Sequence, residues 1–406
     1  MVRNLCMRIT SSLALGTFFF SLALVGAACS SSRESFPGDD KPDAGNLGPA
    51  LNGDASTTVS VTFSGTIYAP NGTLPMANAL FYVTAKEPEA IPEGAYCDQC
   101  VTLPDDTFGV SGADGAFEFT AKMPAGKAWI VTQKGQFRRV REVEIKKEET
   151  IKVDKDDSTL PGRSSPSEGD TIPKMAVLKD ASDYDHIYES LNKLGIYDFV
   201  TSDRNMLSDG DEVMKYQVLF VPCGSKADPL SANAGIKANL QKFVQSGGKL
   251  YVTDWSYEFV RQPFPNFLNW EGATSTLGSG ASGAEWDAPA TATDQGLADW
   301  LAATGDTSFE VKGNWTTINA INTVPGTNPA GDAVDITPKV WVTANKNGQQ
   351  RPTTVSFENQ CGRVLFSTYH TESGFGGSTT LLAQEKALLY VLLEVGVCLG
   401  ERPGVR

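Results

Sequence analysis

Two cysteines separated by two residues, Cys97 and Cys100, have a spacing that is typical of cysteine chemistry. Such a pair can be a redox centre, half of a metal site or a local disulfide. A redox pair is expected at the start of a helix in a β-α-β unit, whereas this pair lies in a loop between predicted strands. A zinc site needs further ligands, and neither histidine of the chain lies in this segment. We therefore predict a disulfide between Cys97 and Cys100 that closes the loop.

Three further cysteines follow in the second half of the chain. Cys223 lies in a Pro-Cys-Gly turn after a predicted strand. A free thiol there could act as a nucleophile, although a buried small residue is the more common role. Cys361 and Cys398 flank the last predicted strands and the closing helix, so we predict a second disulfide between them. It would stabilise the fold by about 4 kcal/mol.

The first 28 residues have the features of an export signal. Arg3 and Arg8 precede an almost uncharged run from Ser12 to Ala28, which ends in small residues. The run is shorter than the roughly 20 apolar residues of a permanent membrane helix. We predict a signal peptide over residues 1–28 and export by the general secretory route. An exported protein meets an oxidising environment, which is the condition that the predicted disulfides need.

Cys29 follows this signal directly, and a run of serines comes next. Small residues followed by such a cysteine resemble the lipobox of bacterial lipoproteins, although Gly26 stands where leucine is usual. The resemblance implies a diacylated Cys29 and an outer-membrane lipoprotein on the periplasmic or the surface face; the alternative is secretion after Ala28 without a lipid. Residues 29–56 are otherwise rich in Ser, Gly, Pro and Asp, which predicts a disordered tether.

Composition limits the classes of partner. A chain of 406 residues is long enough for two domains. Its formal charge of −14 disfavours nucleic acid, because the phosphate backbone is also negative. The glycine-rich stretch from Gly272 to Gly283 lacks the Gly-Lys-Ser/Thr ending of a phosphate-binding loop. We therefore expect no nucleotide, no other cofactor and no metal.

Residues 57–153 have the pattern of an all-β sandwich. Apolar residues alternate at Val59, Val61 and Phe63, and Asp114-Gly115 predicts a hairpin. The segment resembles the carboxypeptidase regulatory-like (transthyretin-like) module. The residues that carry the resemblance are Gly65-Thr-Ile-Tyr-Ala-Pro-Asn-Gly, the strand from Ala79, Ala113-Asp-Gly-Ala-Phe-Glu-Phe and Met123-Pro-Ala-Gly. The resemblance implies a non-catalytic module that supports, spaces or binds.

Residues 154–171 are rich in Asp, Ser, Pro and Gly and are interpreted as a linker. Residues 172–402 then alternate short apolar strands with helices, which favours a flavodoxin-like α/β domain with a largely parallel sheet. A Gly/Ser/Ala-rich stretch over about 270–331 is interpreted as an insertion. Strands are predicted over 175–178, 216–221, 249–253, 340–343, 353–357 and 363–367, and helices over 187–194, 236–244, 297–302 and 381–392.

The α/β segment also resembles the class I glutamine amidotransferase-like fold, whose active members use a cysteine nucleophile and a His-x-Glu pair. The residues that carry the resemblance are Val218-Leu-Phe-Val-Pro-Cys-Gly, Gly247-Gly-Lys-Leu-Tyr-Val-Thr-Asp and Phe366-Ser-Thr-Tyr-His-Thr-Glu. His370 and Glu372 match the pair, but the nucleophile position falls at Asp254 or Trp255. A carboxylate is a much weaker nucleophile than a thiolate towards an amide, so we expect no glutaminase activity. The alternatives for Asp254, His370 and Glu372 are a repurposed acid/base or ligand-binding cluster and relic polar groups.

The basic residues Arg138, Arg139 and Arg141 lie on one predicted strand. A solvated strand face is the usual explanation, and contact with lipid phosphates or an anionic polysaccharide is the alternative. The other histidine, His186, begins a helix and is interpreted as a surface residue.

Taken together, the segments resemble uncharacterised myxobacterial surface lipoproteins. The residues that carry this resemblance are the signal with Cys29, the Cys97-x-x-Cys100 pair, Gln133-Lys-Gly-Gln-Phe-Arg-Arg and Ile172-Pro-Lys-Met-Ala. The sequence therefore predicts a non-catalytic envelope lipoprotein that acts as a binding, adhesion or scaffold module. Its expected partners are the membrane through the lipid and an envelope polysaccharide or another surface protein. The alternative is an exported hydrolase that uses the degenerate amidotransferase-like site.

Overall fold

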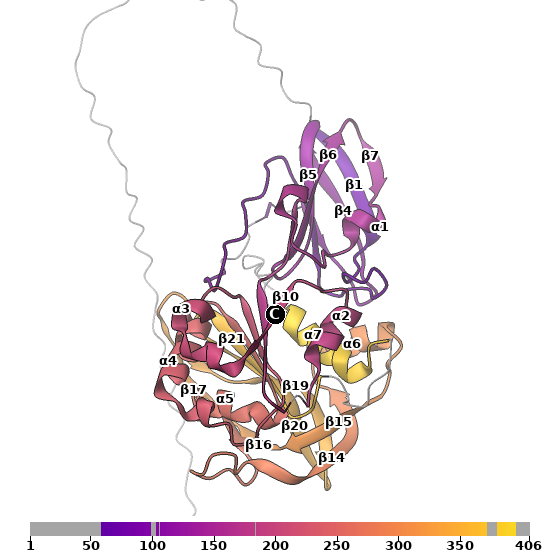
Figure 1. Ribbon diagram of the computed structural model, residues 1–406. Helices are drawn as coiled ribbons and strands as arrows, with labels where there is room; N and C mark the ends of the chain where they lie inside the picture. The colour runs from indigo at the N-terminus through magenta and orange to yellow at the C-terminus, as the bar shows by residue number, and fades with distance from the viewer. Residues whose placement is uncertain (1–57, 99–102, 105, 183, 372–379, 395–406) are drawn as a thin grey trace, which may run out of the picture. The chain divides into compact units, whose positions relative to one another are not determined.

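The computed structural model describes residues 58–98, 103–104, 106–182, 184–371 and 380–394 (Figure 1). The described residues belong to one compact unit. It is a mixed α/β fold, as the sequence predicted. The predicted signal peptide, Cys29 and the tether lie outside the described residues. Among the helices that the structure describes, none has both the length and the apolar character of a membrane span.

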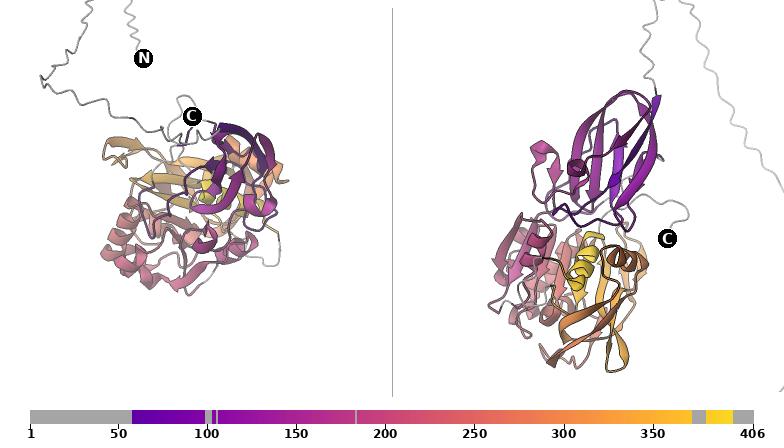
Figure 2. Two further views of the ribbon diagram at one scale, coloured as in Figure 1. Left: turned by 90° about the horizontal axis from the view of Figure 1, so that it is seen from above. Right: turned by 90° about the vertical axis from the view of Figure 1, so that its right-hand side faces the viewer.

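The N-terminal part of this unit consists of strands in two sheets, which the right-hand view of Figure 2 shows running alongside one another. Their orders are β4-β1-β7 and β3-β2-β5-β6-β8. The Phe81 ring of one sheet stacks on the Phe117 ring of the other at 4.5 Å, so the two sheets share a core. The strands are β1 (Thr58–Thr66), β2 (Leu80–Thr84), β3 (Phe108–Val110), β4 (Ala116–Pro124), β5 (Gly126–Lys134), β6 (Phe137–Ile145), β7 (Glu149–Lys152) and β8 (Asp170–Thr171).

The turn at Asp114-Gly115 is present, with Gly115 at a φ of 78°. It joins β3 to β4, however, and these strands belong to different sheets. The predicted hairpin is therefore wrong. A tight turn fixes a reversal of the chain, but it does not fix which strand becomes the hydrogen-bonded neighbour.

The predicted linker over residues 154–171 is a folded segment that packs on the β-rich part. It contains the short helix α1 (Lys155–Ser158) and the strand β8, which pairs with β6. The Asp170 carboxylate accepts hydrogen bonds from the Arg139 guanidinium at 2.7 and 2.9 Å. It also lies 2.9 Å from Nη1 of Arg141. This bidentate, partly buried contact explains why a polar sequence is ordered here.

The C-terminal part is built on a nine-stranded sheet of order β10-β9-β11-β12-β21-β20-β19-β14-β15. The pairings from β10 to β21 are parallel, and those from β21 to β15 are antiparallel. The sheet is thus mixed, and the predicted largely parallel sheet is wrong for its second half. Its strands are β9 (Met175–Lys179), β10 (Phe199–Asp203), β11 (Val218–Val221), β12 (Lys249–Thr253), β14 (Ala281–Ala292), β15 (Phe309–Thr316), β19 (Lys339–Lys346), β20 (Gln349–Asn359) and β21 (Gly362–Ser367).

Both faces of the parallel half of this sheet are buried, which explains the continuous apolar runs of β9, β11 and β12. Successive residues of β9 point into two separate cores, Met175 and Val177 into one and Ala176 and Leu178 into the other. Helix α4 (Ala234–Gln245) covers one face, while α2 (Ile187–Lys193), α6 (Gln295–Ala303) and α7 (Ala383–Glu394) cover the other (Figure 1).

The stretch over 270–331, interpreted as an insertion, contributes β14 and β15 to one edge of the main sheet. The predicted helix near 297–302 is confirmed as α6, and the indole of its Trp300 is fully buried. The Nε1–H group of Trp300 donates to the carbonyl of Pro75 at 2.7 Å. This part of the chain is therefore an integral component of the compact unit.

Candidate functional site

Three neighbouring parallel strands bring three reactive side chains to one edge of the sheet. Cys223 follows β11, Asp254 follows β12 directly, and His370 follows β21. In the sheet β11 is next to β12 and β12 is next to β21. Because the carboxyl ends of parallel strands lie at the same edge, residues far apart in the sequence meet there.

The three side chains converge on one point. The Asp254 Oδ2 atom lies 3.8 Å from Cys223 Sγ and 3.4 Å from His370 Nε2. The sulfur, the carboxylate oxygen and the imidazole nitrogen all lie within 4.8 Å of one another. The cluster is buried, with exposed fractions of 1% for Cys223, 0% for Asp254 and 8% for His370.

Asp254 has the backbone conformation of a sharp strand-to-helix turn. Its φ is 43°, in the left-handed region that few non-glycine residues adopt. The turn leads from β12 into the short 3-10 helix η4 (Asp254–Tyr257). The Asp254 Oδ1 atom accepts hydrogen bonds from the backbone N–H of Trp315 and from the hydroxyl of Thr316, both at 3.0 Å. Those contacts fix the carboxylate and leave Oδ2 for Cys223 and His370.

The environment changes the pKa of each group. Burial raises the pKa of the Cys223 thiol to about 11, and the Asp254 carboxylate adds to this rise. Burial also raises the pKa of Asp254 to about 6, against the opposing effect of His370. Burial would lower the pKa of His370, but Asp254 and the Cys223 thiol outweigh it and raise that pKa well above its usual value. A buried thiol with a raised pKa is a poor nucleophile.

A second buried carboxylate forms hydrogen bonds with residues adjacent to the cluster. Asp185 accepts hydrogen bonds from the backbone N–H of Thr371 at 3.0 Å and from the hydroxyl of Thr253 at 2.7 Å. That hydroxyl accepts in turn from the backbone N–H of Cys223 at 2.8 Å. The network ties the ends of β12, β11 and β21 together.

The arrangement differs from a nucleophilic triad. In a triad the carboxylate orients one imidazole nitrogen while the nucleophile contacts the other. Here the Asp254 carboxylate lies next to Nε2 of His370 and next to the Cys223 sulfur at the same time. Nε2 makes no hydrogen bond of good geometry despite its burial. The sulfur, the carboxylate oxygen and the imidazole nitrogen therefore all face a common point.

A row of aromatic side chains lies beside this cluster. Trp255 follows Asp254, and its ring packs edge-on against Trp315 at 5.1 Å and against Tyr184 at 5.8 Å. Tyr184 is 48% exposed, and both indoles are partly exposed. The Nζ atom of Lys226 lies 5.7 Å from the centre of the Trp255 ring. We call Tyr184, Trp255 and Trp315 the aromatic row.

The structure joins only part of the residues that the sequence singled out. Asp254 and His370 lie close together, as a shared acid/base or ligand-binding cluster requires. Glu372, the third predicted member, lies outside the described residues. Cys223, treated separately in the sequence, belongs to the same cluster. Sequence reasoning missed Asp185, Trp315 and Thr316. Asp185 could have been noted as a polar residue just beyond a buried strand, but Trp315 comes from a strand whose neighbour could not be predicted.

The disulfide pairing differs from the prediction. Cys97 is bonded to Cys361, and the two residues are separated by 264 positions. The predicted partners of both are therefore wrong; Cys100 and Cys398 lie outside the described residues. Cys223 is a free buried cysteine, in agreement with its more common role. The bond joins the N-terminal β segment to the turn between β20 and β21.

The basic side chains of β6 are engaged within the protein. Arg139 and Arg141 bind Asp170, and Arg138 donates to the backbone carbonyl of Glu89 at 2.8 Å. These contacts do not favour the alternative of an anionic ligand on this face. His186 precedes α2 and is partly exposed.

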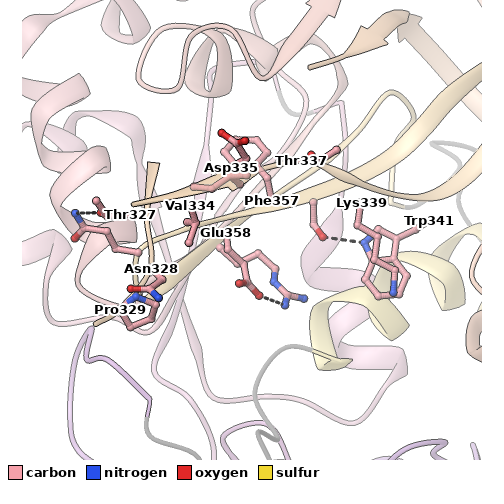
Figure 3. Close-up of a pocket in the computed structure, with 14 residues that line it drawn as sticks. Thr327, Asn328, Pro329, Val334, Asp335, Thr337, Lys339, Trp341, Phe357 and Glu358 are labelled. Atoms are coloured by element: carbon pink, nitrogen blue, oxygen red, sulfur yellow. Dashed lines mark hydrogen bonds and ion pairs between the residues drawn. The ribbon is translucent and has the colours of Figure 1, made fainter. Parts of the chain in front are cut away.

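An open pocket of about 600 Å³ lies elsewhere, next to the ribbon of β17 (Val324–Thr327) and β18 (Ala333–Ile336) (Figure 3). Three of the charged groups that line it already have partners. Arg363 binds Glu358 at 2.7 Å, and Lys339 binds Asp294 at 2.7 Å while lying over the Trp341 ring. None of the residues that line it belongs to the Cys223 cluster, so this pocket carries no functional assignment.

Comparisons with known proteins give structural likenesses alone. No family model matches, and no curated protein matches. A ThuA-like protein from Bacteroides uniformis is 12% identical over 53% of this chain and 87% of its own, with a TM-score of 0.35. A GMP synthase subunit from Thermoplasma acidophilum is 10% identical over 54% and 92%, with a TM-score of 0.35. A β-galactosidase from Rahnella sp. R3 is 13% identical over 57% and 32%, with a TM-score of 0.33. Likenesses as weak as these carry no argument about activity.

Proposed function

We propose that this chain is an exported, lipid-anchored envelope protein whose α/β part binds a neutral polysaccharide without transforming it. The observation that carries the proposal is the aromatic row at the carboxyl edge of the sheet. Open α/β sheets bind ligands at that edge. Tyr and Trp rings offer flat apolar faces with polar tips, which suits the C–H faces and hydroxyl groups of sugars.

The charge of the chain favours a neutral ligand over an anionic one. The formal net charge is −14, which disfavours an acidic polysaccharide. Arg139 and Arg141 of β6 are paired with Asp170 and do not provide an alternative anionic site.

Burial of the Cys223 cluster argues against the alternative of an exported hydrolase. A hydrolytic mechanism requires a nucleophile or a base that a substrate can reach. Asp254 is fully buried, and its Oδ1 atom already accepts two hydrogen bonds. These features support binding rather than turnover.

Replacing Trp255 with alanine is expected to weaken polysaccharide binding by about 30-fold, because a central aromatic contact typically contributes about 2 kcal/mol or more. The measurement is quenching of tryptophan fluorescence by a soluble dextran, a galactomannan and a neutral xylan. Alginate serves as the anionic comparison. Trp129→Ala is the matched control, since this partly exposed indole lies on β5.

Equal affinity in Trp255→Ala and Trp129→Ala, or quenching by alginate alone, would contradict the binding proposal. Release of reducing ends from a bound polysaccharide would favour the hydrolase. The release of reducing ends therefore separates the two candidate functions.

The lipid anchor has its own test. We expect cells that express the chain to incorporate radioactive palmitate into it, and we expect Cys29→Ala to abolish the label, because that cysteine directly follows the predicted signal. Cys6→Ala is the control and should keep the label. A chain that is exported but unlabelled would support the alternative of secretion after Ala28.

A further inference from the structure

We propose that Cys223, Asp254 and His370 together bind one transition-metal ion of the Zn²⁺ class. This inference concerns the buried cluster and not the aromatic row, so it goes beyond the proposed function. The sequence did not predict it, because the three ligands come from turns that are widely separated in the chain and share no local motif.

The donor set suits such an ion. A thiolate, an imidazole and a carboxylate are the three ligand types that Zn²⁺ binds in proteins. The sulfur favours a borderline or soft ion over Mg²⁺ or Ca²⁺, which prefer oxygen ligands only.

The spacing of the ligand atoms also suits it. With Zn–S near about 2.3 Å and Zn–N and Zn–O near about 2.0 Å, tetrahedral geometry places the ligand atoms roughly 3.3 to 3.6 Å apart. The observed separations are 3.4 Å between His370 Nε2 and Asp254 Oδ2, and 3.8 Å between Cys223 Sγ and the same oxygen. The Cys223 sulfur and the His370 nitrogen lie within 4.8 Å of each other, so one bound ion would draw these two atoms closer together.

The cluster has an unmet requirement that an ion would satisfy. His370 is nine-tenths buried, yet its Nε2 atom makes no hydrogen bond of good geometry, which is rare for a buried polar atom. A bound cation would hold Cys223 as a thiolate, Asp254 as a carboxylate and His370 as a neutral imidazole, because metal binding displaces protons from the groups that coordinate the ion.

The surroundings hold the ligands in place. Trp315 and Thr316 fix Asp254 through Oδ1, and Thr253 fixes the backbone of Cys223. Gly313 approaches the imidazole so closely that a Cβ there would lie 3.2 Å from His370 Nδ1. Outer contacts of this kind orient metal ligands and tune their affinity.

The test uses the full chain and Co²⁺, which replaces Zn²⁺ and reports on its ligands by absorption. We expect about one equivalent of metal per chain, with a thiolate-to-cobalt band in the near ultraviolet and visible bands typical of tetrahedral coordination. Cys223→Ser should remove the near-ultraviolet band, and His370→Ala should weaken binding at least about tenfold. His186→Ala, which changes the other histidine of the chain, should bind cobalt like the native protein. Binding should weaken as the pH falls, because protons compete for the thiolate and the imidazole.

Two results would overturn the proposal. One is a folded native chain that shows no thiolate-to-cobalt band; the other is a band that survives in Cys223→Ser, which would assign the metal to other cysteines. If Cys223→Ser fails to fold, the melting temperature of the native chain is measured with Zn²⁺ and with a chelator. A melting temperature that Zn²⁺ does not raise above the value measured with the chelator contradicts the site. Trp255→Ala should bind metal normally, so failure of the metal site and failure of the polysaccharide proposal are distinguishable.

Discussion

Replacing both Cys97 and Cys361 with serine is expected to lower the free energy of unfolding by about 4 kcal/mol. The bond links residues 264 positions apart, so it restricts the unfolded chain over most of its length. Restriction of the unfolded state is the main source of stabilisation in the chain-entropy description of disulfides. The measurement is guanidinium unfolding followed by tryptophan fluorescence, with the reduced native protein as the control.

Peptide mapping of the non-reduced protein checks the pairing itself. A cross-linked peptide that contains Cys97 and Cys361 is expected. Peptides that join Cys97 to Cys100, or Cys361 to Cys398, would restore the local pairings and contradict the structure. If the free energy of unfolding of the double variant falls by less than about 1 kcal/mol, the bond restricts the unfolded chain only slightly.

Replacing Arg204 with methionine is expected to lower the free energy of unfolding by about 3 to 5 kcal/mol, because breaking a buried ion pair leaves its partner uncompensated. The guanidinium is buried and binds the Asp228 carboxylate at 3.0 Å. It also donates to the Pro222 carbonyl at 2.6 Å and to the Ser256 hydroxyl at 2.9 Å. These contacts connect the turns that carry Cys223 and Asp254, so the variant should also weaken cobalt binding.

Arg163→Met provides the matched control. Arg163 forms an exposed ion pair with Asp198 at 3.3 Å. Exposed pairs of this kind contribute less than about 1 kcal/mol. Both variants are measured by the same chemical unfolding. Equal decreases in their free energy of unfolding would show that the buried contacts of Arg204 stabilise the fold no more than an exposed ion pair does.

The metal proposal and the polysaccharide proposal assign different roles to one edge of the sheet. The buried cluster would join the ends of β11, β12 and β21, while the aromatic row presents its rings beside them. An ion would then stabilise the turn that positions Trp255, because Asp254 precedes it in the chain. Metal removal should therefore weaken polysaccharide binding less than Trp255→Ala does.

Local sequence patterns were sufficient for most individual elements. The apolar runs at 175–178 and 249–253 predicted β9 and β12, and the spacing of Ile236, Leu240 and Phe243 predicted α4. Such patterns succeed because each face of a strand or helix must contact apolar atoms.

The sequence by itself therefore determined the mixed α/β class, most strands and helices, and the placement of Asp254 and His370 after strands. Only the tertiary structure decided the antiparallel half of the sheet, the Cys97–Cys361 bond and the meeting of Cys223 with Asp254 and His370. The reason is physical: apolar periodicity reports which face of an element is buried, whereas strand order and disulfide partners depend on packing between segments that lie far apart in the chain.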